Sequence, residues 1–392
     1  MKKVLILIIC LFLCGCTNYV ELDKLAIMTG MGIDLVDGEY KITIQIADTQ
    51  KQGTGSTTST SPVRFKNYSY TDESIHGAAR RVMTEMPKKI YSNHLQLLVL
   101  SESIIKENIG DIIDFLFREV ELRSDFYVLV SKDCTPEDIL GVVTQVYPIN
   151  AVGINKLLTN NSKYLGSSAL ITFDDLTNYY ITKTKEIVLP VITIDGEIDK
   201  SSSDKNLESS IPESLLKIDG TALFKGDEFA FYLNSDDSIY YNLSKNGIDV
   251  TVIDYECAKE KYVTIEILDG KSDIKITKNK PEVTIKVKTK GNLTSSMCEY
   301  KIDKEEGIKQ IEVKAEEEIK KNILKVIDIS KEYNSDIFDI RDIYFRKNNT
   351  FYKIIENNYD EFYKNLQINV EVELNLFEKG NGLQVIENEK DN

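Results

Sequence analysis

The first part of the chain alternates apolar and polar residues in the way that β-strands do. Residues 25–34 form an apolar run that contains glycines, and in residues 40–46 every second side chain is apolar. Asp37-Gly38 between them is a favoured two-residue turn. This pattern predicts a β-hairpin over residues 25–48, followed by a long exposed loop rich in Gly, Ser and Thr.

Helical spacing then alternates with strand patterns up to about residue 195. Apolar residues three and four positions apart predict a helix over residues 71–86, which Pro87 ends. Further helices are expected after residues 103, 135 and 172, and strands in the segments LQLLVL, DFYVLVS and EIVLPVITID. Pro190 in the last of these predicts an edge strand, because proline cannot donate a hydrogen bond to a neighbouring strand.

Strand patterns dominate after the polar segment 199–210. A second hairpin with a turn at residues 225–227 is predicted first, and three further strands are expected between residues 249 and 289. One long helix follows from about residue 304 to 331, with an apolar stripe at every third or fourth position and charged residues elsewhere. A second helical segment and an unbroken alternating strand over residues 366–376 complete the pattern.

These patterns predict an α+β (mixed α/β) fold with mixed sheets, a long helix near the C-terminus and a long final strand. The length suggests two or three domains at about 150 residues each, and we divide the chain at the polar segment and near the change from strands to the long helix. The segments are a signal peptide over residues 1–15, an N-terminal mixed α/β domain over 16–198, a β-rich middle domain over 211–280, a C-terminal α/β domain over 281–378 and a loose acidic tail over 379–392.

The N-terminus has the three parts of a secretory signal peptide. Two lysines precede an apolar run of about ten residues, which is too short to cross a membrane. The run ends in Leu13-Cys14-Gly15-Cys16, which resembles the lipobox of bacterial lipoproteins. That resemblance implies cleavage after Gly15 and a diacylglyceryl anchor on the thiol of Cys16, which would hold the protein on the outer face of a membrane. An ordinary signal peptide or a buried helix is the alternative, but a core helix would not end in Gly-Cys-Thr-Asn.

Composition and charge narrow the function further. With 42% hydrophobic and 28% charged residues the chain is expected to fold, and no later segment has 18 uninterrupted apolar residues that could form a transmembrane helix. A net charge of −15 repels phosphate, so nucleic acid is not expected as a partner. Cys134, Cys257 and Cys298 lie far apart and form no Cys-x-x-Cys pair, so we expect buried free thiols, or one incidental bridge among them.

No catalytic or metal-binding motif stands out. The two histidines, His76 and His94, are not in a zinc-ligand spacing, and no Gly-x-Ser-x-Gly elbow occurs. Ser103 and Lys106 have the Ser-x-x-Lys spacing, but the partner motifs of that chemistry are missing, so solvent-facing helix residues are the preferred interpretation. We therefore expect no cofactor, no metal and no enzyme activity, and a role in binding or assembly.

Segments spread over most of the mature chain match one known family. YVELDKLAIMTGMGIDL contains Glu21 and Leu25, NHLQLLVLSE contains a His-Leu strand, FLFREVELRSDF contains Arg118 and Arg123, and GTALFKGDEF contains a Gly-x-Ala-x-Phe-Lys-x-Asp hairpin. In these motifs and their order the chain resembles the Ger(x)C family of spore germination lipoproteins, the C subunits of nutrient germinant receptors. The tryptophan that the family usually has near Tyr19 is missing, since the chain contains no Trp.

The resemblance implies three α/β domains on the outer face of the spore's inner membrane, no enzyme activity, and two integral-membrane partners, the A and B subunits of the receptor. Glu21, Leu25, Arg118 and Arg123 are then candidate partner-contact residues. Two interpretations of the arginines stay open: burial against carboxylates, or a solvated helix end with local ion pairs. The alternatives for the whole chain are a lipid-anchored solute-binding protein of a nutrient transporter and a hydrolase of the cell envelope.

The predicted anchor lies close to the folded part of the chain. Only eight residues, 17–24, separate Cys16 from the first predicted strand. Fully extended, these residues span about 25–30 Å, at roughly 3.3–3.6 Å each. A tether this short does not let the protein move far from the lipid surface. We therefore expect the N-terminal domain to lie against the membrane, where it can meet integral-membrane partners.

Overall fold

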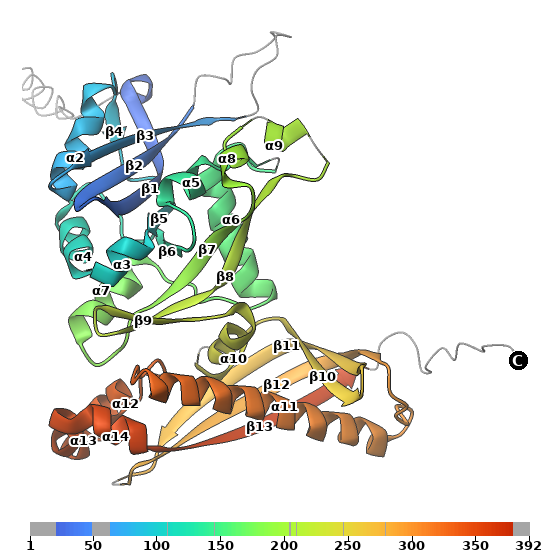
Figure 1. The fold of residues 1–392 in the computed structure, drawn as a ribbon. Helices are drawn as coiled ribbons and strands as arrows, with labels where there is room; N and C mark the ends of the chain where they lie inside the picture. Colours follow the sequence, from blue (N-terminus) through green and yellow to red (C-terminus); the bar gives the residue numbers. More distant parts are fainter. Residues whose placement is uncertain are drawn as a thin grey trace, which may run out of the picture.

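Two mixed β-sheets form the framework of the chain, and Figure 1 shows the second sheet below the first. The first nine strands make up one sheet and the last four make up the other. The mixed sheets and the helices around them confirm the predicted fold class. In this computed structural model the described residues are 21–48, 63–107, 109–144, 146–203, 205–208, 210–245, 247–278 and 280–378. The predicted signal peptide, the lipobox and the acidic tail lie outside the described residues.

A block of parallel strands lies at the centre of the first sheet. The strand order is β3-β2-β1-β5-β6-β7-β8-β9, with β4 beside β1. Strands β1, β5, β6 and β7 run parallel, whereas β2, β3, β8 and β9 add antiparallel neighbours on either side. The hairpin predicted at the start of the chain is confirmed as β1 and β2. The strands are β1 (Leu25–Val36), β2 (Glu39–Ala47), β3 (Phe65–Asp72), β4 (Lys89–Tyr91), β5 (Leu97–Leu100), β6 (Tyr127–Ser131), β7 (Val188–Gly196), β8 (Ser214–Lys225) and β9 (Glu228–Leu233).

Helices cover both faces of this parallel block, as the burial of β5 shows. Leu97 and Val99 pack in one core cluster with residues of α5 and α6, while Leu98 and Leu100 pack in another with residues of α3, α4 and α7. A parallel strand that is apolar on both faces needs cover on both, which these helices provide. The helices of this part are α2 (Ile75–Arg81), α3 (Glu102–Glu107), α4 (Ile109–Arg118), α5 (Pro136–Gly141), α6 (Asn150–Tyr164) and α7 (Phe173–Thr182).

Two glycines let helix α5 lie directly on β1. A β-carbon on Gly30 would come within 2.9 Å of the Leu140 side chain, and one on Gly32 within 2.7 Å of Pro136. Larger residues at these positions would push the helix away from the sheet. Thr135 begins the helix with a capping box. The glycines in the first predicted strand therefore serve the close approach of a helix that follows about 100 residues later.

The polar segment 199–210 joins two neighbouring strands of the first sheet. It holds the short helices α8 (Ile198–Ser201) and α9 (Lys205–Glu208), and the strands on either side of it, β7 and β8, pair antiparallel. The predicted second hairpin, β8 and β9, therefore extends the first sheet. The edge position predicted from Pro190 is wrong, because β7 lies between β6 and β8. The ladder to β8 changes register just after Pro190, and such an irregularity tolerates the missing N–H.

The second sheet carries one long helix across a face, as Figure 1 shows. Its order is β10-β11-β12-β13, and β13 runs parallel to β12. Helix α11 (Glu305–Glu332) buries most of its predicted apolar stripe, from Ile311 to Val326. The boundary expected between residues 280 and 281 falls in the turn between two paired strands of this sheet. The strands are β10 (Thr251–Ala258), β11 (Lys261–Ile276), β12 (Glu282–Ser296) and β13 (Gln367–Glu378).

Helix α10 and a group of C-terminal helices connect the two sheets. The side chain of Lys245, the last residue of α10, is only 8% exposed, and its ammonium lies 3.1 Å from the carboxylate of Asp339. Nearby, the hydroxyl of Thr184 donates to Asp342 at 2.9 Å. Polar contacts thus join the end of the first sheet to the C-terminal helices. The connecting helices are α10 (Ser235–Lys245), α12 (Ile340–Lys347), α13 (Asn349–Ile355), η4 (Glu356–Asn358) and α14 (Tyr359–Asn365).

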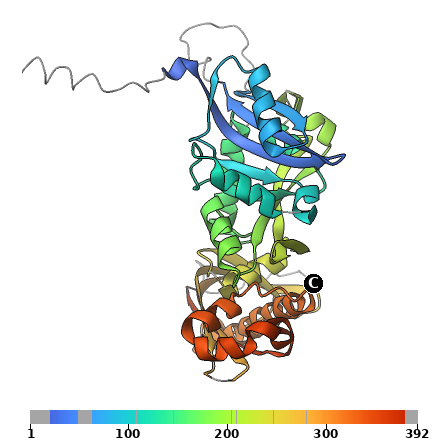
Figure 2. The ribbon, with the colours of Figure 1, turned by 90° about the vertical axis from the view of Figure 1, so that its left-hand side faces the viewer.

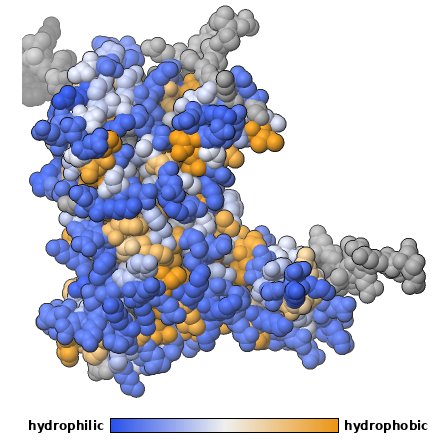
Figure 3. All heavy atoms as spheres, in the orientation of Figure 1, coloured by the Kyte–Doolittle hydropathy of each residue, from blue (hydrophilic) through white to orange (hydrophobic). Residues whose placement is uncertain are grey.

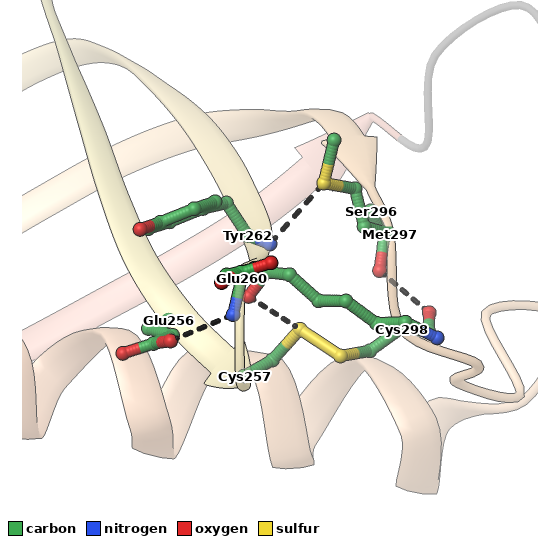
Figure 4. Close-up of a disulfide and its surroundings, with 8 residues drawn as sticks. Glu256, Cys257, Glu260, Tyr262, Ser296, Met297 and Cys298 are labelled. Carbon is green, nitrogen blue, oxygen red and sulfur yellow. Dashed lines mark hydrogen bonds between the residues drawn. A yellow bond between two sulfur atoms is a disulfide. The ribbon is translucent and has the colours of Figure 1, made fainter.

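A disulfide links Cys257 and Cys298 at one end of the second sheet (Figure 4). Cys257 lies in β10 next to the turn into β11, and Cys298 follows β12. The hydroxyl of Ser296 donates to the carbonyl of Cys298 at 2.7 Å and holds the segment after β12 in place. Of the outcomes expected from the sequence, one bridge is therefore the observed one, because strand pairing brings two distant cysteines together. Cys134 is a free thiol, and burial raises its pKa to about 12.

We expect this disulfide to stabilise the fold measurably. Replacing both cysteines (Cys257→Ser with Cys298→Ser) should lower the free energy of unfolding by about 2–4 kcal/mol, because the bridge restricts the unfolded chain over a separation of 41 residues. Urea unfolding under non-reducing conditions, followed by circular dichroism, measures the change. Cys134→Ser is the control that keeps the bridge. Equal unfolding midpoints for the double variant and the parent would contradict the expectation.

Candidate functional site

The segments that hold the candidate partner-contact residues are linked at one end of the first sheet through Lys89 and Glu121. Leu25, the first residue of β1, pairs with Lys89 of β4. The Lys89 ammonium lies 2.9 Å from the carboxylate of Glu121, in the loop that links α4 to β6. Arg118 and Arg123 flank this glutamate in the sequence. We call this surface the N-terminal face, and we define it as residues 21–25, 89–91 and 118–125.

Both arginines of the N-terminal face are exposed. Arg118 is 74% exposed and donates to Asp114, one turn earlier in α4, through two hydrogen bonds of 2.8 and 2.9 Å. Arg123 is 65% exposed and lies 2.6 Å from Asp125. The interpretation that the two arginines are buried against carboxylates is therefore wrong, because α4 ends at Arg118 and the following loop runs over the surface. The hydrogen bond from Arg118 holds the pKa of Asp114 below its usual value.

The other two candidate residues have different environments. Glu21 is 55% exposed and forms a 2.9 Å ion pair with Lys24, across the short η1 (Leu22–Lys24). An exposed pair of this kind contributes little to stability, so Glu21 can change partner at small cost. Leu25, in contrast, is buried at the start of β1. Leu25 therefore belongs to the core beneath the N-terminal face and is not accessible to a partner. Glu21 is accessible on the surface of this face.

Exposed apolar side chains lie among the charges at this end of the sheet. Val120 is 98% exposed, Phe117 on α4 is 66% exposed, and Met83 on η3 (Val82–Thr84) is 45% exposed. His76 of α2 lies 3.5 Å from Glu119, which places the loop after α4 against the neighbouring helix. Exposed apolar residues framed by polar ones are typical of contact surfaces. The sequence analysis missed them, although a valine between two glutamates is a visible signal.

Apolar residues also reach the surface elsewhere in the molecule. In the view of Figure 3 they form patches over several elements, and polar residues separate these patches. Isolated apolar side chains on a surface are ordinary in soluble domains. The N-terminal face combines Val120, the most exposed of the large apolar side chains described, with ion pairs that are all exposed and weak. Such a surface can exchange its internal pairs for contacts with a partner.

The structure does not bring Ser103 and Lys106, the Ser-x-x-Lys pair noted in the sequence, into contact with each other. The hydroxyl of Ser103 donates to Asp34 at 2.8 Å, whereas Lys106 pairs with Glu102, so the two side chains have different partners. Over the described ranges, no three His, Cys, Asp or Glu side chains are grouped so that they could hold a metal ion. Within the same ranges, no helix combines the length and the apolar character needed to cross a membrane.

Two family models match the chain one after the other. Residues 18–194 match the spore germination protein N-terminal domain, and residues 219–380 match the "spore germination B3/GerAC like, C-terminal" family. The division between the models falls near the end of β7 and the start of β8, in the region of the polar segment 199–210.

Curated relatives are similar over nearly their whole length. Spore germination protein KC of Bacillus subtilis (strain 168) is 26% identical over 382 residues, which cover 94% of this chain and 93% of the relative. Spore germination protein B3 of the same strain is 23% identical, with coverages of 94% and 95%. Among solved structures, the crystal structure of the GerBC protein matches with a TM-score of 0.56 and 17% identity, covering 89% of this chain and 97% of that one. This structural match concerns the fold.

The exposure of Arg118 leads to a clear expectation for stability. Arg118→Ala should shift the melting temperature by less than about two degrees, because a solvated i,i+4 pair contributes little. Lys245→Met is the comparison variant, since it removes the nearer cation, at 3.1 Å, from the largely buried Asp339, and it should lower the melting temperature by several degrees. Differential scanning calorimetry measures both. A drop for Arg118→Ala as large as that for Lys245→Met would show that Arg118 has a structural role in the fold.

Proposed function

The chain belongs to the Ger(x)C family of spore germination proteins, and we propose that it is the C subunit of a nutrient germinant receptor. In this proposal it is a non-catalytic protein that acts through contacts with the integral-membrane A and B subunits, and these contacts help to trigger germination. The observation that carries the proposal is the match of both family models, in order, over most of the chain. The N-terminal face, with its exposed charges and the exposed Val120, is the surface that we assign to these contacts.

We further propose that a diacylglyceryl group on Cys16 holds the protein on the outer face of the spore's inner membrane. The apolar run and the Leu-Cys-Gly-Cys sequence at its end support this assignment. The disulfide between Cys257 and Cys298 agrees with it, because disulfides persist outside the reducing cytosol. The lipobox-like sequence and the disulfide lie in different parts of the chain, and each of them supports a location outside the cytosol.

The structure shortens the tether that the sequence predicts. Strand β1 begins at Leu25, and residues 22–24 form η1, so only residues 17–21 remain for an extended link to Cys16. A 3₁₀-helix rises only about 2 Å per residue, so the whole tether reaches roughly 25 Å. The N-terminal face lies at the start of β1 and is thereby held close to the membrane, where the A and B subunits are expected.

The solute-binding alternative is less well supported by the fold. A solute-binding protein of this size has two similar lobes with a parallel βαβ pattern. Here the first sheet has nine strands and the second has four, with a single long helix across one face of the second. The two sheets are therefore not copies of one lobe. The hydrolase alternative lacks a set of catalytic side chains among the described residues, as the separate partners of Ser103 and Lys106 illustrate.

The proposed anchor can be tested at one atom. Cys16→Ala removes the thiol that accepts the lipid, so the protein should leave the membrane fraction or remain unprocessed. Cys14→Ala is the matched control, because it changes a neighbouring cysteine that the proposed cleavage discards. Metabolic labelling with a fatty acid, followed by fractionation, measures the result. Label that persists on Cys16→Ala would mean that another residue carries the lipid.

The tether can be tested by its length. A flexible Gly/Ser linker inserted after Asn18 should impair the germination response to nutrients while membrane attachment persists, because the N-terminal face can then leave the membrane. The same linker after Gly380, in the acidic tail, is the control. Loss of refractility in spore suspensions measures germination, and fractionation measures attachment. A normal response of the Asn18 insertion would rule out the membrane-held position.

A further inference from the structure

A cavity of about 370 Å³ lies where the end of the first sheet meets the C-terminal helices. One wall comes from the end of α7, the segment before β7 and the turn between β8 and β9, and the opposite wall comes from α12. Its volume falls in the range of small-molecule sites. Four of its side chains are cations and two are tyrosines: Lys183, Lys185, Lys225, Arg341, Tyr179 and Tyr180.

This collection of cations is unusual for the chain. The protein has a net charge of −15, yet only two carboxylates, Glu186 and Asp227, line the cavity beside the four cations. Glu186 accepts a hydrogen bond from the backbone N–H of Gly226, and its carboxylate lies 3.6 Å from Lys225. Lys225 also pairs with Asp360 at 2.6 Å. Glu186 and Lys225 therefore already have partners within the protein, and their contacts stabilise the turn between β8 and β9.

The other three cations are less fully paired. Lys183 forms no ion pair with any described residue, whereas Lys185 forms a 3.8 Å ion pair with Asp339 and lies 5.3 Å from the centre of the Tyr179 ring. Arg341 also has no ion pair within the described ranges, and its Nε is buried without a hydrogen-bond partner. Its guanidinium lies 5.1 Å from the centre of the Tyr359 ring, which holds it in place. A buried donor without a partner is costly, so a carboxylate that hydrogen-bonds to this guanidinium would stabilise the site.

We propose that this cavity binds a small organic carboxylate. The planar guanidinium of Arg341 matches the two oxygens of a carboxylate, and Lys183 and Lys185 neutralise its charge from the opposite wall. Two acidic side chains in the same lining oppose a doubly charged phosphate. The ligand would bridge the first sheet and α12, so its binding would tighten the junction between the two parts of the chain. This inference is independent of the proposed receptor role.

Calorimetric titration of the full-length, lipidated chain in detergent micelles tests this site. Propionate is the probe, propionamide is the neutral analogue of nearly the same shape, and inorganic phosphate is the competing anion, all at constant ionic strength. We expect saturable binding of propionate only. Arg341→Gln should weaken it about tenfold or more, because a charge-assisted pair of hydrogen bonds is lost.

Two further variants make the test decisive. Lys183→Gln changes an exposed residue that has no structural partner, so it should fold normally and still weaken propionate binding several-fold. Lys353→Gln removes an exposed charge on α13, outside the cavity lining, and should leave binding unchanged. Equal binding of propionamide, tighter binding of phosphate, equal weakening in the Lys353→Gln control, or no heat with propionate at millimolar concentration would each overturn the proposal.

Discussion

The largely buried ion pair between Lys245 and Asp339 constrains the arrangement of the two sheets, because it lies at their junction. Burial by itself disfavours the charged ammonium, but the carboxylate of Asp339 outweighs it and raises the pKa of Lys245. The ammonium also lies 5.6 Å from the ring of Tyr241 and 5.8 Å from that of Tyr179. Removing one partner of a buried pair costs about 3–5 kcal/mol, because the other charge remains in a dry site. Lys245 ends the helix that leaves the first sheet and Asp339 precedes α12, so the pair fixes one part against the other.

Other polar contacts also join elements of the two parts of the chain, and they restrict how these parts are oriented. The hydroxyl of Ser335 donates to the carbonyl of Phe224 at the end of β8, and Lys325 on α11 lies 2.7 Å from Asp237 on α10. Hydrogen bonds and ion pairs depend on orientation more strongly than apolar contacts do. They therefore favour one geometry of the junction, beside which the cationic cavity is lined by residues of α7, the β8–β9 turn and α12.

The junction separates two ends of an elongated molecule with different surfaces. Figure 2, like Figure 1, shows the second sheet and the C-terminal helices at the end opposite to strands β1 to β4. The N-terminal face has exposed ion pairs and Val120, while a disulfide stiffens the hairpin region of the second sheet. If the lipid holds the first end at a membrane, the second end projects away from it. The two ends are joined by the polar contacts of the junction and by one apolar core cluster that includes residues of both sheets.

The sequence alone determined the features that depend on local periodicity. The spacing of apolar residues predicts the first hairpin, the apolar stripe of α11 and the final strand. It does so because this spacing reflects contacts between residues that are close in the sequence. Contacts between distant segments were decided by the tertiary structure. The pairing of β8 with β7, the bridge between Cys257 and Cys298 and the surroundings of Arg118 each depend on chain segments that the local pattern does not relate. The burial of Lys245 is of the same kind, because a lysine at a helix end is ordinarily solvated and only the approach of Asp339, 94 residues later in the sequence, makes burial possible.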